Sequence, residues 1–171
     1  MKMNIILVGM MGSGKSTVGK LLSRQMHWNF YDSDQWIEQK QGQTIAEIFK
    51  SNGENFFRKL EQETLQELCA QKNSIIATGG GAPCFEENWK YLQEHGWVVW
   101  LKARPETLWH RLQKSPVGQR PLLAAEDFET FKTLLKKREP CYEQAQAIIE
   151  TDTLKIEPLL QKIIELYPHP L

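Results

Sequence analysis

Short runs of consecutive apolar residues recur along the chain, and each is followed by a segment whose apolar residues are spaced three or four positions apart. The runs have the length and continuity of strands in a buried parallel sheet. The spaced segments have the periodicity of helices that cover such a sheet. We predict strands at Asn4–Val8, Trp28–Tyr31, Ser74–Ala77, Val98–Leu101 and Ala147–Glu150.

Helical periodicity predicts the elements between and after these strands. It extends over Lys15–Met26, through Trp36 and Ile37, through Ile45, Ile48 and Phe49, over Phe56–Leu68, around Trp89 and Leu92, and over Pro158–Tyr167. Strands that alternate with helices predict an α/β fold with a mainly parallel sheet. Because right-handed crossovers place the loops that carry sites at the carboxyl ends of the strands, we expect the functional site there.

Composition narrows the class of protein. The chain has 171 residues, which is the size of one domain, and we expect a single domain over residues 1–171. Its 21 Lys and Arg residues equal its 21 Asp and Glu residues, which argues against nucleic acid or membrane as a partner, since such polyanions are usually met by a basic excess. We expect a cytoplasmic monomer without a signal peptide or membrane span.

The cysteines Cys69, Cys84 and Cys141 are irregularly spaced and include no C-x-x-C pair. They predict neither a disulfide framework nor a zinc site, and we interpret each as a small buried apolar residue in a reducing compartment.

Residues 9–17, GMMGSGKST, match the pattern G-x-x-x-x-G-K-S/T between the first predicted strand and the first predicted helix. Glycines there let backbone amides turn toward phosphate oxygens at a helix N-terminus. We expect Lys15 to neutralise the β- and γ-phosphates of a nucleotide and the Ser16 hydroxyl to ligate Mg²⁺. The alternative, a glycine turn into an ordinary helix, is disfavoured by this spacing and context.

Asp32 and Asp34 follow the second predicted strand, and they face the same side if the strand continues through them. The third strand ends at Thr78–Gly81 without the acidic residue that many P-loop enzymes place there. Asp32 is then available to the magnesium shell, through a water molecule, and Asp34 could accept or orient a hydroxyl proton. The alternative is that Asp34 only caps the following helix.

Gly79, Gly80 and Gly81 offer backbone amides without side chains, which suits a close-fitting small substrate. The alternative is a flexible strand-to-helix turn that ends at Pro83.

Arg58 has Glu54 four residues before it and Glu61 three residues after it. On a helix these carboxylates would hold a guanidinium fork that grips an anionic substrate group, or they would form only an exposed ion pair. Arg138 could be a second fork or could complement a helix dipole. Arg120 lies in a Pro/Gly-rich loop and could swing onto the transferring phosphate, or it could be a solvated turn residue.

Together these segments resemble the shikimate kinase family. The matching motifs are the P-loop, D-S-D from Asp32, G-E-x-x-F-R-x-x-E from Gly53, T-G-G-G from Thr78, R-P-L-L from Arg120 and R-x-P-x-Y from Arg138. The resemblance covers nearly the whole chain and implies a three-layer α/β/α fold of the nucleoside-monophosphate-kinase type with a five-stranded parallel sheet. It implies transfer of the γ-phosphoryl group of ATP to the 3-hydroxyl of shikimate, in the route to chorismate and aromatic amino acids.

The resemblance also implies roles for individual residues. It places ATP at Gly12, Ser13, Gly14, Lys15, Ser16, Thr17, Arg111 and Arg120, and shikimate at Asp34, Arg58, Gly79, Gly80, Gly81 and Arg138. It makes Lys15, Asp34 and Arg120 catalytic, and gives Mg²⁺ to Ser16 and Asp32. The acceptor-binding segment spans about residues 32–61 and a lid about residues 114–125. An arginine that the family carries after the last strand has no counterpart at Thr151–Leu154.

Two other classes of function stay open at this point. One is another small-molecule P-loop kinase, such as a gluconate or nucleotide kinase. A gluconate kinase gives no reason for the R-x-P-x-Y segment, and a nucleotide kinase should show more lid arginines. The other is a non-catalytic ATP-binding regulator, against which the presence of both Asp34 and Arg120 argues.

Overall fold

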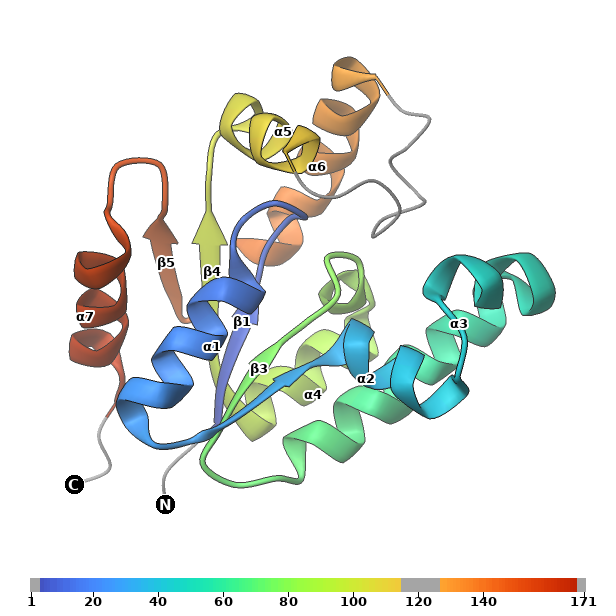
Figure 1. The fold of residues 1–171 in the computed structure, drawn as a ribbon, viewed down its shortest axis with the longest axis horizontal. Coiled ribbons are helices and arrows are strands. Elements are labelled where there is room, and N and C mark those ends of the chain that lie inside the picture. The colour runs from blue at the N-terminus through green and yellow to red at the C-terminus, as the bar shows by residue number, and fades with distance from the viewer. Residues whose placement is uncertain (1–3, 115–126, 169–171) are drawn as a thin grey trace.

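The computed structural model describes residues 4–114 and 127–168, which form one sheet with helices on both faces (Figure 1). In chain order the elements are β1 (Asn4–Val8), α1 (Lys15–Met26), β2 (Asn29–Asp32), α2 (Ser33–Gln41), α3 (Ile45–Cys69), β3 (Ser74–Ala77), the short 3₁₀ helix η1 (Ala82–Cys84), α4 (Glu86–His95), β4 (Gly96–Lys102), α5 (Pro105–Gln113), α6 (Phe128–Tyr142), β5 (Ala147–Glu150) and α7 (Ile156–Leu166). Within the described ranges, no helix has both the length and the apolar character needed to span a bilayer.

The sheet has five parallel strands in the order β2-β3-β1-β4-β5. Its centre is β1, whose Ile6 pairs with Ile76 of β3 and Val98 of β4. Every residue of β1 is buried, because helices cover both faces of the sheet. The P-loop follows this central strand, so the topology sets it at the middle of the carboxyl edge.

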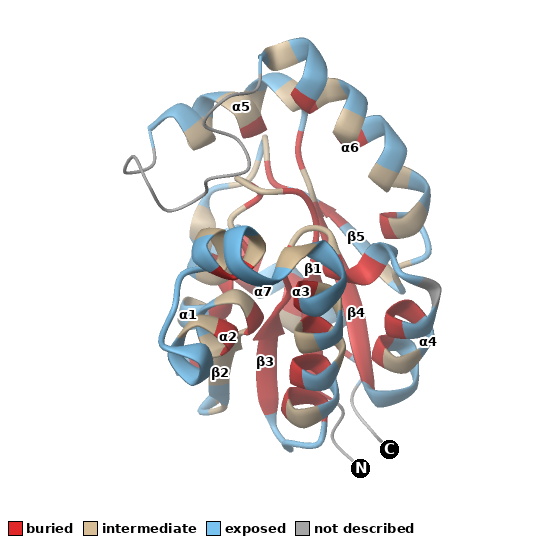
Figure 2. Ribbon diagram, turned by 90° about the vertical axis from the view of Figure 1, so that its right-hand side faces the viewer, coloured by how far each residue is buried: buried red, intermediate tan, exposed pale blue. Residues whose placement is uncertain are grey.

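Two apolar layers hold the helices on the sheet. On one face Ile5 and Leu7 pack with residues of α1 and α7. On the other face Ile6 and Val8 pack with residues of α3, α4 and α6. Figure 2 shows the buried residues concentrated in the sheet and on the inward sides of the helices. This arrangement confirms the expected three-layer α/β/α fold with five parallel strands.

Several element boundaries differ from those expected. Strand β2 begins and ends one residue later, at Asn29 and Asp32, and β4 begins at Gly96. Helix α7 begins at Ile156, since its proline lies in the first turn, where no intrahelical N–H is needed. Helix α3 joins two of the predicted segments across Gly53, whose φ of 80° and ψ of 176° are not helical.

Candidate active site

The loop between β1 and α1 is shaped by glycine. At Gly9 and Gly12 the φ values are 141° and 81°, which L side chains rarely adopt. A Cβ at Gly12 would also lie 2.8 Å from the carbonyl oxygen of Leu108. The N-cap of α1 is Gly14, which has no side chain to occupy the amides of the first turn. The loop therefore presents backbone N–H groups and a helix N-terminus to an anion.

Lys15 is held over this loop. Its side chain is buried, and Nζ donates hydrogen bonds to the carbonyl oxygens of Gly9 at 2.8 Å and Met10 at 3.0 Å. An ammonium group held at a glycine-rich loop before a helix N-terminus is chemically suited to a polyphosphate.

Asp32, rather than Asp34, caps α2. Its Oδ1 accepts from the backbone N–H groups of Asp34 at 3.1 Å and Gln35 at 3.3 Å, and its Oδ2 accepts from the Ser16 hydroxyl at 2.5 Å. Because α2 begins at Ser33, the strand does not continue through Asp34, so the condition for the two carboxylates to face the same side is not met. The alternative that Asp34 caps the helix is wrong, because the cap is Asp32. Ser16 and Asp32 do lie together, as two adjacent oxygen ligands would.

Asp34 lies in the first turn of α2, with its carboxylate against the loop that follows β3. A Cβ at Gly79 would lie 2.5 Å from Asp34 Oδ1 and 3.3 Å from Glu61 Oε1, so a side chain there would displace the Asp34 carboxylate. The Gly79 N–H donates to Ser33 Oγ at 2.9 Å. Ser33 was not singled out from the sequence, where its only signal is its place between two aspartates.

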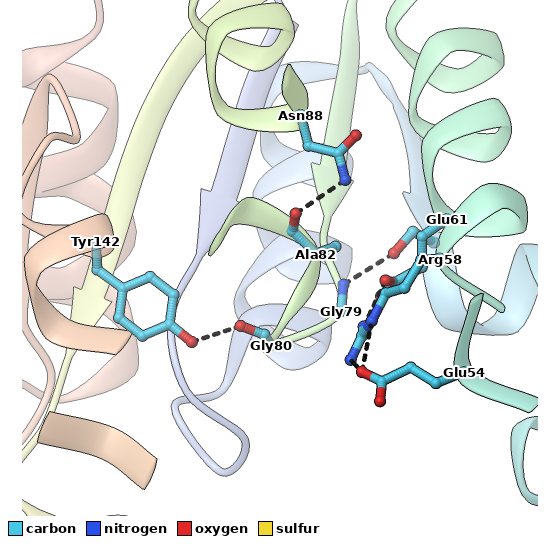
Figure 3. Close-up of polar contacts among 9 residues, drawn as sticks. Glu54, Arg58, Glu61, Gly79, Gly80, Ala82, Asn88 and Tyr142 are labelled. Atoms are coloured by element: carbon cyan, nitrogen blue, oxygen red, sulfur yellow. Dashed lines mark hydrogen bonds and ion pairs between the residues drawn. The ribbon is translucent and has the colours of Figure 1, made fainter. Parts of the chain in front are cut away.

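Arg58 is held between two carboxylates of α3, as its spacing predicts (Figure 3). Nη1 donates to Glu61 Oε2 at 2.6 Å, and Nη2 and Nε donate to Glu54 Oε1 at 3.0 and 3.2 Å. The guanidinium also lies near two aromatic rings, 4.8 Å from the centroid of Phe85 and 5.5 Å from that of Phe57. These contacts fix the direction of the fork and leave it half-buried.

Glu61 is the most strongly perturbed carboxyl group of this region. Only 2% of the residue is exposed, and burial raises its pKa from 4.5 to about 7, although the charge and hydrogen bond of Arg58 act in the opposite direction. The nearby Asp34 carboxylate raises the pKa further, and Arg138 lowers it. Burial also opposes the charge of Arg58, but Glu61 and Glu54 more than offset it and raise the pKa of Arg58.

Arg138 reaches the same loop from α6. A Cβ at Gly80 would lie 3.3 Å from Arg138 Nη1, and a Cβ at Gly81 would lie 3.1 Å from Arg138 Nη2 and 3.4 Å from Arg58 Nη1. The guanidinium groups of Arg58 and Arg138 therefore converge on Gly81, two residues after Gly79, which faces Asp34. Arg138 lies before the last turn of α6, which continues through Pro140 to Tyr142.

Tyr142 and Asn88 hold this loop from two sides (Figure 3). The Tyr142 hydroxyl donates to the carbonyl oxygen of Gly80 at 2.5 Å, and Asn88 Nδ2 donates to that of Ala82 at 3.0 Å. Asn88 was missed by the sequence analysis, because nothing in its local pattern distinguishes it from a surface residue.

Arg111 of α5 connects the P-loop with the segment after β5. Its Nη1 donates to Thr151 Oγ1 at 3.2 Å and to the Gly12 carbonyl at 3.5 Å, and its Nη2 donates to the Thr151 carbonyl at 3.2 Å. Arg120 and nearly all of the expected lid lie outside the described residues.

Comparisons with known proteins identify the family of the chain. The sequence model of the shikimate kinase family matches residues 11–168. A shikimate kinase of Caldanaerobacter subterraneus subsp. tengcongensis is 41% identical over 165 residues, which are 96% of this chain and 95% of that protein. The solved structure of a shikimate kinase from Acinetobacter baumannii in complex with shikimate is 41% identical, with a TM-score of 0.90 over 96% of this chain and 92% of that one.

More distant structures share the fold alone. A gluconokinase from Sinorhizobium meliloti is 14% identical, with a TM-score of 0.60 over 95% of this chain and 89% of that one. By contrast, the family model matches residues 11–168, and the 41% identity extends over 96% of the chain. The chain therefore belongs to the shikimate kinase family.

Proposed function

We propose that this kinase transfers the γ-phosphoryl group of ATP to the 3-hydroxyl of shikimate, producing shikimate 3-phosphate and ADP, with the residues around the T-G-G-G loop as its acceptor site. One observation carries the assignment: Asp34 faces Gly79, while Arg58 and Arg138 converge on Gly81, so a carboxylate and two guanidinium groups meet on three consecutive residues. A small hydroxy acid needs this combination, because its acid group pairs with arginine and its hydroxyl donates to a carboxylate.

ATP binds at the P-loop in this proposal. The backbone amides of residues 12–17 and the N-terminus of α1 receive the phosphate oxygens, and Lys15 neutralises the β- and γ-phosphates. Arg111, which lies between Gly12 and Thr151, flanks the base.

The residues present fit a magnesium ion. The Ser16 hydroxyl and the Asp32 carboxylate already share a hydrogen bond, and hydroxyl and carboxylate oxygens are the ligands that Mg²⁺ prefers. Ser16 would bind the ion directly and Asp32 through water. When bound, Mg²⁺ would neutralise charge on the β- and γ-phosphates.

The chemical step is an in-line displacement. The acceptor oxygen attacks the γ-phosphorus, its proton passes to or is oriented by the Asp34 carboxylate, and the bond to the ADP oxygen breaks. Arg58 and Arg138 hold the acceptor acid group, which fixes the hydroxyl against the phosphate. Arg120 would add positive charge to the transferring group when the lid closes and excludes water.

We further propose that the protein is a cytoplasmic monomer whose partners are ATP and shikimate, with neither nucleic acid nor membrane among them. The equal numbers of acidic and basic side chains support the absence of nucleic acid and membrane partners, since no excess positive charge is available to bind a polyanion. Size-exclusion chromatography with light scattering tests the monomer, and a dimer mass would contradict it.

A coupled ADP-release assay with Mg-ATP tests the function, using shikimate, gluconate and nucleoside monophosphates as acceptors. Of these acceptors, we expect only shikimate to give rapid ADP release, and phosphorus NMR should show a phosphate monoester on the acceptor. Equal turnover with gluconate, or ADP release independent of any acceptor, would contradict the assignment. The Asp34→Asn variant should keep nucleotide binding and lose transfer, which separates the acceptor site from the ATP site.

A further inference from the structure

Two cysteines from distant parts of the chain lie side by side next to the acceptor arginines. Cys84 ends η1, directly after the T-G-G-G loop, and Cys141 lies in the last turn of α6. Helix η1 packs against α6, which brings the side chains of Cys84 and Cys141 near enough to influence each other's pKa. Neither is in a disulfide, and Cys84 is exposed, contrary to the expectation that each cysteine is buried.

The surroundings of this thiol pair favour a nucleophilic Cys84. The interaction with Cys141 lowers the pKa of Cys84 more than the partial desolvation of its sulfur raises it. The positive charges of Arg138 and Arg58 lower the pKa further, and the nearby Glu61 opposes them. The thiolate is the reactive form of cysteine. Cys69 offers an internal contrast, because burial raises its pKa to about 12 and hides it in the core.

We propose that Cys84 and Cys141 form a redox-modification site, at which a peroxide converts the two thiols to a disulfide that ties η1 to α6 and weakens binding of the acidic acceptor. The existence of the disulfide is independent of the reaction that the protein catalyses. Its effect on acceptor binding rests on the proposed function.

The oxidation balances with hydrogen peroxide as the oxidant. The Cys84 thiolate attacks one peroxide oxygen, the O–O bond breaks, hydroxide leaves and a sulfenic acid forms. The Cys141 sulfur then attacks the Cys84 sulfur, the S–O bond breaks and the S–S bond forms. The thiol protons end on the two water molecules produced, so peroxide gains the two electrons that the sulfurs lose. A dithiol reductant reverses the change by thiol–disulfide exchange.

The disulfide changes the acceptor site because both of its ends are attached to that site. Arg138 lies three residues before Cys141 on α6, and Gly81 lies three residues before Cys84. A Cβ at Gly81 would be only 3.1 Å from Arg138 Nη2, so the loop and the guanidinium are already closely packed. An S–S bond is about 2.05 Å long, so the two sulfurs must come closer together than in a hydrogen bond, and we expect this to move η1 relative to α6.

Small displacements of the loop and the Arg138 guanidinium are expected to weaken binding and positioning of the acceptor. A misplacement of about 1 Å can reduce the rate of a positioned reaction by about 100-fold. The ATP site lies at the P-loop, which joins β1 to α1 and which Arg138 contacts at Met10. We therefore expect the disulfide to act mainly on kcat/KM for the acceptor, with a smaller effect on KM for ATP.

Peptide mapping of the full-length protein after treatment with hydrogen peroxide tests the modification itself. We expect a Cys84–Cys141 cross-linked peptide, with Cys69 still a free thiol, and loss of the cross-link after dithiothreitol. If the folded protein yields no such peptide, or a cross-link through Cys69, the modification site is wrong. This readout does not depend on any acceptor, so it stands even if shikimate is not phosphorylated.

Kinetics before and after oxidation test the consequence. We expect kcat/KM for shikimate to fall at least about fivefold and to recover with dithiothreitol, as misplacement of the acceptor arginines requires. Cys84→Ser and Cys141→Ser should keep the kcat/KM that the wild type has before oxidation and should lose the response to peroxide. Cys69→Ala should respond to peroxide like the wild type. A disulfide that leaves kcat/KM unchanged, or a serine variant that is still inhibited, would overturn the coupling to the acceptor site.

Discussion

Replacing Glu61 by glutamine is expected to change how the stability of the protein depends on pH. The pKa of Glu61 is raised from 4.5 to about 7, chiefly by burial. Since one pKa unit corresponds to about 1.4 kcal/mol, ionising Glu61 in the folded protein is about 3 kcal/mol less favourable than in the unfolded chain. The unfolded chain loses this proton first, so Glu61 contributes stability that is complete below pH 4.5 and is lost as the pH rises through about 7.

Urea unfolding of the wild type and Glu61→Gln at several pH values measures this contribution. Between pH 4.5 and 8, we expect the unfolding free energy of the wild type to fall relative to the variant by about 3 kcal/mol. Glu63→Gln is the matched control, because Glu63 is an exposed carboxylate of the same helix and its removal should leave the pH dependence unchanged. A difference that stays flat, or that rises with pH, would refute the reasoning and mean that Arg58 outweighs burial at Glu61.

Four further substitutions test the site. Lys15→Met should abolish ADP formation while circular dichroism stays native, and unchanged turnover would contradict the phosphate role of the loop. Arg58→Ala should raise KM for shikimate about 10- to 100-fold by removing a charged hydrogen-bonding fork, with KM for ATP little changed; a reversed pattern would move Arg58 out of the acceptor site. Phe85→Ala should raise KM for shikimate about two- to fivefold through loss of the cation–π contact with Arg58, with kcat unchanged, whereas Phe85→Tyr should behave as the wild type. Arg120→Ala should lower kcat about 1,000-fold with shikimate affinity preserved, and an unaltered kcat would reduce the lid to a passive cover.

Local pattern predicted much of the fold correctly. The continuous apolar run of β1 and the P-loop after it are signals contained within a few consecutive residues, as is the spacing that pairs Arg58 with Glu54 and Glu61. Short-range signals of this kind depend on backbone preference and side-chain periodicity, which do not require knowledge of distant contacts.

The position of Asp34 shows where local reasoning fails. Whether Asp34 continues the strand or lies on the helix depends on where α2 begins, and that boundary is set when Asp32 caps the helix and also binds Ser16 of α1. A change of one residue in a helix start turns every following side chain by about 100°. The direction of a carboxylate therefore depends on a contact 16 residues away in the chain.

The sequence by itself determined the class of fold, the phosphate loop and the kind of residues available for an acidic acceptor. Only the tertiary structure decided that Arg58 of α3 and Arg138 of α6 meet at Gly81, that Asp34 faces Gly79, and that Cys84 lies against Cys141. The physical reason is that parallel strands with helical crossovers bring their carboxyl ends to one edge of the sheet, so residues far apart in the chain become neighbours. Which of their side chains then touch depends on the phase of each helix and on close packing at glycine, which no local pattern records.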